Sequence, residues 1–367
     1  MEYVENDLVR IAKRENNTRR SYLVVDPLQG KHIPVVPSRA LKLFSSLAET
    51  IRDEYNDENL LLVGFAETAT AIGAQVAISI GAKYIQTTRE PIHDVEYLFF
   101  SEEHSHATEQ KLIKDDIDAI INQTDRIVFV EDEVTTGNTI LNIIIKILDS
   151  QYAGKLKYAV ASLLNGMDSE HIESYERRNI SLHYLVKTDH SSYGERADRF
   201  LGDGHYYKCL DKENDNYSTI CIPGKVDARR LVDSIQYANA CENFWLEIKN
   251  EIGEFVGKNV LVIGTEEFMF PALYVAEKIE SQGNNVLCHS TTRSPIAVSL
   301  EKEYPLHNRY ELKSMYDSDR KNFIYDIGEY DRVFVITDSP KTEYEGEKTL
   351  VNALKTRNEN ITVIRWC

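Results

Sequence analysis

Cysteine is scarce in this chain of 367 residues: five are present, and no two of them form a C-x-x-C pair. An odd number of cysteines without metal-type spacing predicts neither a disulfide framework nor a zinc site. No apolar run approaches the roughly 18 residues that a membrane-spanning helix needs, and the first residues lack the apolar core of a secretory signal. These absences together predict a cytoplasmic protein without a membrane partner.

Positive charge is also in deficit. Lys and Arg number 42 against 59 Asp and Glu, which gives a formal net charge of −17. Such a chain repels nucleic-acid backbones, so we expect no nucleic-acid partner. Two phosphate-binding patterns, G-x-x-x-x-G-K-[ST] and G-x-G-x-x-G, are missing as well. Their absence argues against a P-loop NTPase and a nicotinamide-binding Rossmann domain.

The composition that remains is globular, with 42% hydrophobic and 28% charged residues, and the length suggests two or three domains. Apolar segments rich in β-branched residues alternate with helical patterns. This alternation predicts an α/β fold with a parallel sheet, helices on both faces, and ligands at the carboxyl ends of the strands. The expected strands are 21–26, 59–65, 83–88, 126–132, 157–165, 259–265, 285–292 and 332–338, and the expected helices are 38–55, 68–82, 139–151, 226–252 and 271–283.

A polar stretch at 188–225 shows little periodicity and is interpreted as a mixed region that ends in a linker. We therefore expect one α/β domain over 1–215 and a second over 216–367. The two halves contain matching motifs in the same order, which predicts duplication, although any two α/β units share Val-rich strands. The matched pairs are Gly64 with Gly264, Arg89 with Arg293, and Asp132 with Asp338, at offsets of 200, 204 and 206 residues.

The most informative segment is 127–139, where an apolar strand ends in Glu131 and Asp132 and a hydroxyl-rich loop leads into a helix. Backbone N–H groups at such a turn favour an anion, and Gly137 allows close approach. Carboxylates repel phosphate but suit sugar hydroxyls or a Mg²⁺ ion shared with the ligand. Phosphate, vicinal hydroxyls and magnesium together describe a phosphoribosyl group, and a plain acidic turn is the alternative. The loop residues are Thr135, Thr136, Gly137, Asn138 and Thr139.

This segment resembles the PRPP-binding signature of type I phosphoribosyltransferases: an apolar strand, an acidic pair, two mostly apolar residues and a Thr/Gly loop. Glu133 departs from that pattern, because it stands where the family has an apolar residue and adds charge near the ligand. The resemblance implies that Glu131 and Asp132 hold the ribose hydroxyls of PRPP and that the loop holds its 5-phosphate. It also implies Mg²⁺ as cofactor, held mainly by PRPP, with Glu131 and Asp132 as possible protein ligands.

The resemblance extends upstream. Arg89 ends the next strand, where family members often place a basic residue against pyrophosphate; a surface ion pair is its alternative role. His104 and His106 stand in the place of the mobile catalytic loop, and a metal site or a solvated loop are the alternatives. The segment that would contact pyrophosphate, or form a plain turn, comprises Glu67, Thr68, Ala69 and Thr70. Possible acceptor-side residues are Lys31, His32 and Arg39.

The second half contains Thr291-Thr-Arg-Ser-Pro295 and resembles the TRSP domain, which occurs C-terminal to an orotate-type phosphoribosyltransferase-like domain. The resemblance covers most of the chain and implies a type I phosphoribosyltransferase-like sheet followed by a second, related α/β domain. Such two-domain proteins are associated with bacterial tellurite-resistance and stress gene clusters. That association implies a role in making a nucleoside- or nucleotide-like metabolite.

The second half has lost part of the donor signature. Thr337 replaces one member of the acidic pair, and 339–349 carries three Glu and a Pro in place of the Thr/Gly loop. Because carboxylates repel phosphate, we expect this domain not to bind PRPP in the same way. It could bind a product, catalyse a second step, cover the first site, or be a structural companion. The residues of its possible oxyanion site are Thr265, Thr291, Thr292, Arg293 and Asp338.

The expected function is transfer of the phosphoribosyl group of PRPP to an unknown, nitrogenous acceptor, with release of pyrophosphate. The partners would be small molecules, and a homodimer is possible. One alternative is the reverse reaction, catalysed by a nucleotide pyrophosphorylase or phosphorylase. Another is a non-catalytic module that senses PRPP or a nucleotide.

Overall fold

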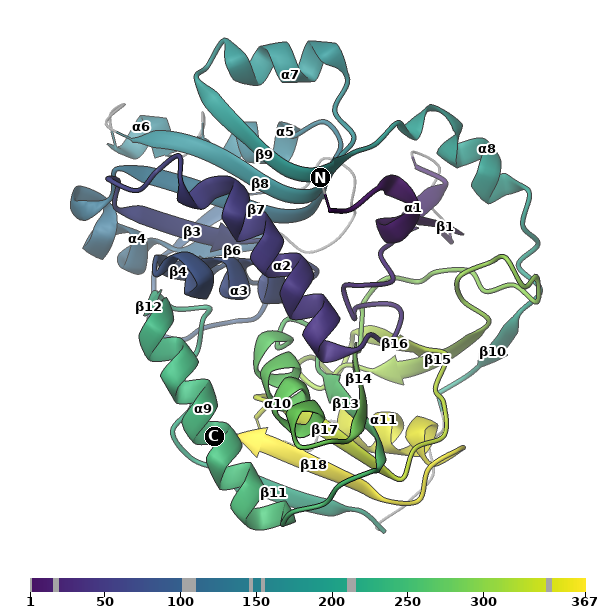
Figure 1. The fold of residues 1–367 in the computed structure, drawn as a ribbon. Coiled ribbons are helices and arrows are strands. Elements are labelled where there is room, and N and C mark those ends of the chain that lie inside the picture. The colour runs from purple at the N-terminus through teal and green to yellow at the C-terminus, as the bar shows by residue number, and fades with distance from the viewer. Residues whose placement is uncertain are drawn as a thin grey trace. The chain divides into compact units, whose positions relative to one another are not determined.

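The computed structural model of the chain forms two compact units, each built from several stretches of sequence (Figure 1). The first unit consists of Met1–Glu5, Leu41–Asp189 and Val226–Asn239, and the second of Asn6–Ala40, His190–Lys225 and Ala240–Cys367. The units therefore interleave along the chain, and the domain division at 215/216 stays a prediction. The structure describes residues 2–15, 20–100, 110–144, 148–152, 156–209, 216–340 and 345–367.

The first unit is built on a six-stranded sheet in which every neighbouring pair is parallel except the edge pair of β12 and β4. Every residue of β8 after Lys157 is buried, as the continuous apolar strands predict for a sheet covered on both faces. In order across the sheet the strands are β12 (Val232–Asp233), β4 (Lys83–Gln86), β3 (Leu60–Gly64), β7 (Arg126–Val134), β8 (Lys157–Asn165) and β9 (Ile180–Lys187).

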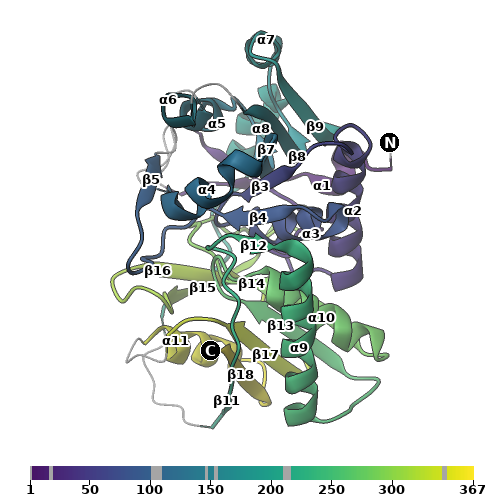
Figure 2. The same ribbon diagram turned by 90° about the vertical axis from the view of Figure 1, so that its left-hand side faces the viewer.

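Helices lie on both faces of this sheet (Figure 2). α3 packs on β3 and β4, and four of its buried residues are Ala or Gly, so helix and sheet approach closely. A hairpin of β5 (Tyr97–Phe100) and β6 (Gln110–Ile113) follows β4. The helices of the unit are α2 (Pro37–Arg52), α3 (Thr70–Ile80), α4 (Lys114–Ile120), α5 (Asn138–Ile143), α6 (Asp149–Tyr152) and α7 (Ser169–Glu176), with a 3₁₀ turn η1 (Ile121–Gln123).

The second unit is built on a five-stranded sheet that is parallel throughout. Its strands run in the order β11 (Ser218–Ile222), β18 (Ile361–Trp366), β17 (Arg332–Thr337), β13 (Asn259–Gly264) and β14 (Asn285–Ser290). Its main helices are α9 (Ser234–Ile252), α10 (Phe270–Ser281) and α11 (Gly346–Leu354). The fold class is therefore α/β in both units, as the alternation of segments predicts.

Two smaller sheets complete the second unit. β15 (Asn308–Lys313) lies between β10 (His205–Tyr207) and β16 (Lys321–Tyr325), and β1 (Arg10–Lys13) pairs with β2 (Tyr22–Val25). Side chains from both small sheets share an apolar core. The remaining elements are α1 (Glu5–Leu8), η3 (His190–Ser192) and α8 (Tyr193–Asp198). Among the described residues no helix has the length and apolarity to cross a bilayer.

Several boundaries differ from the sequence predictions, and two of these differences involve an additional strand. The helix expected over 226–252 begins only at Ser234, because Val232 and Asp233 pair with β4 and the Asp233 carboxylate accepts the N–H groups of the next turn. The stretch expected to end in a linker instead supplies β11, an edge strand of the second sheet. Five residues of mixed polarity carry too weak an alternation to be recognised as a strand.

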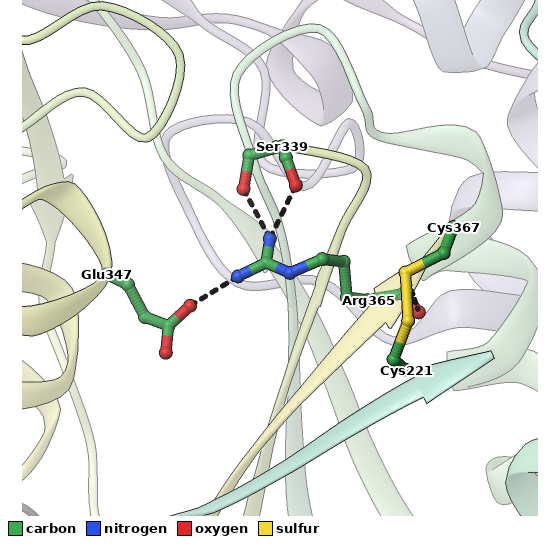
Figure 3. The surroundings of a disulfide bond; sticks show 5 residues. All are labelled: Cys221, Ser339, Glu347, Arg365 and Cys367. Atoms are coloured by element: carbon green, nitrogen blue, oxygen red, sulfur yellow. Dashed lines mark hydrogen bonds and ion pairs between the residues drawn. A yellow bond between two sulfur atoms is a disulfide. The ribbon is translucent and has the colours of Figure 1, made fainter. Parts of the chain in front are cut away.

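The expectation that the cysteines form no disulfide is wrong, because Cys221 and Cys367 are bonded (Figure 3). Residues 146 positions apart meet because β11 and β18 are neighbouring parallel strands, with Cys221 opposite Arg365. The spacing of the cysteines along the sequence does not indicate this pairing. The argument for a reducing compartment that rests on the cysteines therefore loses its basis, and a cytoplasmic location stays a prediction.

The two units share one register of strand pairing. Gly64 of β3 lies opposite Gln86 and Val130, and Gly264 of β13 lies opposite Ser290 and Ile336. These partners lie 204 and 206 residues apart, the offsets already seen in the sequence.

The hairpins that follow agree as well. Phe100 lies opposite Gln110, and Leu312 lies opposite Asn322, each position 212 residues further along the chain. This agreement supports the duplication hypothesis, which remains a proposal.

Candidate active site

The carboxyl ends of β4, β3 and β7 are adjacent at one edge of the first sheet, because these strands are parallel neighbours. They carry the turn around Arg89, the loop 65–69 and the segment 131–137. All three segments are among those predicted to contact PRPP. The topology thus brings them to one edge, where ligands of parallel sheets bind.

A hydrogen bond joins two of these segments. The Thr68 hydroxyl donates to Oδ1 of Asp132 over 2.9 Å. Burial and the neighbouring Glu133 carboxylate raise the pKa of Asp132 to about 6, against the opposing effect of Thr68. A carboxylate with a pKa this close to neutrality is stabilised in its ionised form by any cation or hydroxyl donor that a ligand brings.

The loop after β3 is fixed by residues that the sequence analysis did not identify. The Ala66 N–H donates to the Thr87 hydroxyl over 2.8 Å, and the Gln110 amide donates to the Ala66 carbonyl over 2.9 Å. Thr87 in turn donates to Gln110 over 2.5 Å. The peptide bond between Ala66 and Glu67 is cis. Thr87 opens a TTR-x-PI motif at 87–92 that recurs at 291–296, and this repeat is the signal in the sequence that indicates these contacts.

The loop after β7 requires glycine at one position. Gly137 has φ 70°, and a Cβ there would collide with the Tyr175 hydroxyl and the Met167 methyl group. The Tyr175 hydroxyl donates to the Gly137 carbonyl over 2.7 Å, and α5 begins at the next residue, Asn138. The hydrogen bond from Tyr175 of α7 thus fastens the backbone of this loop at Gly137. Thr135, Thr136, Asn138 and Thr139 are half-buried.

The other residues predicted for this site have different positions. Arg89 is half-buried in the turn after β4, and His104 and His106 lie outside the described residues. Lys31 belongs to the second unit, where its buried ammonium donates to the carbonyls of Glu266 and Thr291 over 2.8 and 2.9 Å. His32 is buried in the same unit, and Arg39 is exposed near the start of α2. Their assignment to the acceptor stays a prediction.

The residues predicted for the second unit form one polar cluster at the carboxyl ends of β13, β14 and β17. Arg293 pairs with Glu266 and Glu267, and Tyr316 donates to Asp338 over 2.7 Å. Tyr316 also contacts the Thr265 hydroxyl over 2.7 Å. It therefore links Thr265 to Asp338, two predicted residues that are far apart in the sequence. Thr291 and Thr292 accept backbone N–H groups, from Glu266 and Ser294 respectively.

A cavity of about 540 Å³ opens at the opposite edge of the first sheet. Arg52, Tyr55, Asn59 and Lys83 are among the residues that line it, near the amino ends of β3 and β4. It contains none of the predicted site residues. Since ligands of parallel sheets bind at the carboxyl ends, we do not assign the reaction to this cavity.

The carboxylates at the end of β7 suit Mg²⁺ as it is bound in nucleotide sites. Mg²⁺ keeps several waters and takes one or two carboxylates together with ligand phosphates. Within the described ranges no three His, Cys, Asp or Glu side chains converge on a metal position. A magnesium site here would therefore depend on phosphate oxygens of the ligand in addition to Glu131 or Asp132.

Comparison with known protein families shows to which family the chain belongs. The family described as phosphoribosyl transferase matches residues 8–195, half of the chain, and the family described as a TRSP domain C-terminal to it matches residues 233–354. The chain belongs to this phosphoribosyltransferase family. The site at the ends of β3, β4 and β7 lies within the matched residues, and the resemblance noted in the sequence is confirmed. No curated protein matches the chain.

Solved structures similar to this phosphoribosyltransferase-family chain include several adenine phosphoribosyltransferases. The Rhodothermus marinus enzyme is 14% identical with a TM-score of 0.36, and covers 50% of this chain and 96% of its own. The Trypanosoma brucei enzyme, solved with AMP, pyrophosphate and ribose-5-phosphate, is 12% identical with a TM-score of 0.34, and covers 50% and 77%. The Leishmania tarentolae enzyme is 14% identical with a TM-score of 0.35, and covers 52% and 88%.

Proposed function

We propose that the first unit transfers the phosphoribosyl group of PRPP to a nitrogen of a small-molecule acceptor and releases pyrophosphate, with Mg²⁺ as cofactor. Family membership supports the class of reaction. The observation that carries the proposal is the bond between Thr68 and Asp132, which joins the loop expected to contact pyrophosphate to the acidic strand end expected to hold the ribose.

In this mechanism Glu131 and Asp132 accept hydrogen bonds from the ribose 2- and 3-hydroxyls. The N–H groups and hydroxyls of 135–139 bind the 5-phosphate, with Gly137 allowing close approach of the backbone. Arg89 and the backbone of 67–70 bind the pyrophosphate. These contacts hold C1 of the ribose in place between the acceptor and the leaving group.

The acceptor nitrogen then forms a bond to C1 while the bond from C1 to the pyrophosphate oxygen breaks and its electron pair leaves with pyrophosphate. A proton on the acceptor nitrogen is lost to solvent or to a nearby base. Positive charge develops on the ribose, and the Asp132 carboxylate, which is mostly ionised above pH 6, stabilises it. Mg²⁺, when bound with PRPP, supplies charge neutralisation to the leaving pyrophosphate.

The test is calorimetry and pyrophosphate release with PRPP and Mg²⁺, using a metabolite that co-purifies with the protein as acceptor. Asp132→Asn should lose activity by at least 100-fold, while Glu170→Gln, the same change on the exposed α7, should keep it. Full pyrophosphate release by folded Asp132→Asn would refute the assignment. PRPP binding without turnover across many acceptors would instead identify a sensor.

A further inference from the structure

In the second unit, Glu266 stands where the first unit has Ala66. Each residue is two positions after the glycine that ends the central strand. Each donates its backbone N–H to a threonine hydroxyl, Ala66 to Thr87 over 2.8 Å and Glu266 to Thr291 over 3.0 Å. The two loops are therefore fastened at the same backbone N–H, and at this position the second unit has a carboxylate side chain where the first has a methyl group. The backbones differ here, since Glu266 has a positive φ and Ala66 does not.

The Glu266 carboxylate is surrounded by donors. Arg293 Nε and Arg320 Nη2 approach its Oε2 to 3.1 and 2.8 Å, and the Ser314 hydroxyl donates to its Oε1 over 2.5 Å. The Glu266 side chain is 1% exposed, while Arg293 and Arg320 are 11% and 17% exposed. Two guanidinium groups and a hydroxyl around one anion are a donor set that suits phosphate as well as carboxylate.

These donors come from positions with counterparts in the first unit. Arg293 lies 204 residues after Arg89, the residue proposed to contact pyrophosphate. Ser314 and Arg320 lie on the connection between β15 and β16, the counterpart of the connection between β5 and β6 that carries the expected catalytic loop. The donor set of the second unit thus comes from the counterpart of Arg89 and from the counterpart of the segment that carries the expected catalytic loop.

The backbone conformation of Glu266 is a second observation that marks this residue as unusual. Its φ is 52°, in the left-handed region that a non-glycine residue seldom adopts. Such a conformation persists where surrounding contacts over-determine it. The contacts here are those of its own carboxylate together with Lys31, which donates to the Glu266 carbonyl over 2.8 Å.

Glu266 lies among several other charged side chains. The cations of this cluster are Lys31, Arg293 and Arg320, and its anions are Glu266, Glu267, 3.2 Å from Arg293, and Asp317, 3.6 Å from Arg320. Removing the Glu266 carboxylate would make this cluster more positive by one charge, while the two arginines that it pairs with stay mostly buried. A buried charge of this kind attracts an anion from solution.

We propose that the second unit contains an anion-binding subsite for a phosphate or diphosphate group, and that the carboxylate of Glu266 occupies this subsite and closes it. The choice of diphosphate as ligand class rests on the proposed function of the first unit. The existence of the subsite rests on the donors around Glu266 alone. In its present sequence the second unit would then not be a second donor site.

The experiment compares Glu266→Ala with Glu347→Ala in the full chain. Glu347 is a matched control, because its carboxylate also pairs with an arginine, Arg365 at 2.5 Å, but with a single guanidinium. Thermal unfolding is followed while inorganic pyrophosphate or phosphate is titrated at constant ionic strength. Any stabilisation that arises in the first unit is common to both variants, and the wild type reports it separately.

We expect a saturable rise of several degrees in the unfolding midpoint of Glu266→Ala beyond that of Glu347→Ala and the wild type. The double variant Glu266→Ala with Arg320→Ala should lose this rise. A response of Glu266→Ala no larger than that of the control would overturn the proposal.

If Glu266→Ala does not fold, Glu266→Gly takes its place with the same readout, since it also empties the subsite and glycine adopts a φ of 52° without strain. Absence of pyrophosphate stabilisation in that variant would equally refute the subsite. Failure of the proposed function would appear elsewhere, as unchanged activity in Asp132→Asn. That result would not change the difference in pyrophosphate stabilisation between Glu266→Ala and Glu347→Ala.

Discussion

The Tyr175 hydroxyl donates to the Gly137 carbonyl over 2.7 Å, which fastens α7 to the loop proposed to hold phosphate. Tyr175 is fully buried, and burial raises the pKa of its phenol, so it stays a donor at every accessible pH. The position of the loop thus depends on a residue 38 positions downstream.

Tyr175→Phe should weaken PRPP binding more than turnover. The variant keeps the ring in its pocket but removes one of two donors to the Gly137 carbonyl, which still accepts the Leu141 N–H over 3.0 Å, a loss of about 1 kcal/mol of stability or less. Looser backbone N–H groups would raise the KM for PRPP several-fold with a smaller change in kcat. Steady-state kinetics and chemical unfolding measure both quantities. An unchanged KM would show that the loop holds its conformation without this bond.

The stability of the protein should depend on pH through Asp132. Its folded-state pKa of about 6 is above the ordinary value, so the stabilising contribution of the protonated form is present below about pH 4 and is lost as pH rises through 6. Asp132→Asn carries no charge and should be more stable than the wild type above pH 6, by at most about 3 kcal/mol. Below pH 4 the two should converge. Urea unfolding across this range measures the difference, and equal stabilities at pH 7.5 would contradict the raised pKa.

The disulfide should stabilise the second unit measurably. Reduction, or replacement of Cys221 and Cys367 by Ser, removes the covalent link between the edge strand β11 and β18. Either change should lower the free energy of unfolding by about 2–4 kcal/mol. Unfolding curves with and without a reducing agent measure this. The reducing agent should bring the wild type to the level of the double Ser variant and leave that variant unchanged.

Thiol labelling of the unfolded, unreduced protein is the control for that prediction. It should modify the three cysteines outside the disulfide, Cys209, Cys241 and Cys288. Five labelled thiols would show that the bond does not form in the protein as purified.

Local sequence predicted the segments of the first site well. The strand ending in Glu131 and Asp132 and the turn at Gly137 can be read from neighbouring residues, because strand, turn and helix signals act over a few positions. The residues that hold these segments in place were missed. Thr87, Gln110 and Tyr175 act on backbone groups of other segments, and such partners leave no local pattern.

By itself, then, the sequence determined two α/β units, the acidic strand end and the Thr/Gly loop, since each depends on short-range preferences and on apolar periodicity. Only the tertiary structure decided that 6–40 joins the second unit, that Cys221 meets Cys367, and that Glu266 faces two arginines. The physical reason is that these relationships join residues far apart in the chain. They exist only once the strands have paired and the side chains are buried. In the protein interior an unpaired charge costs too much free energy to remain.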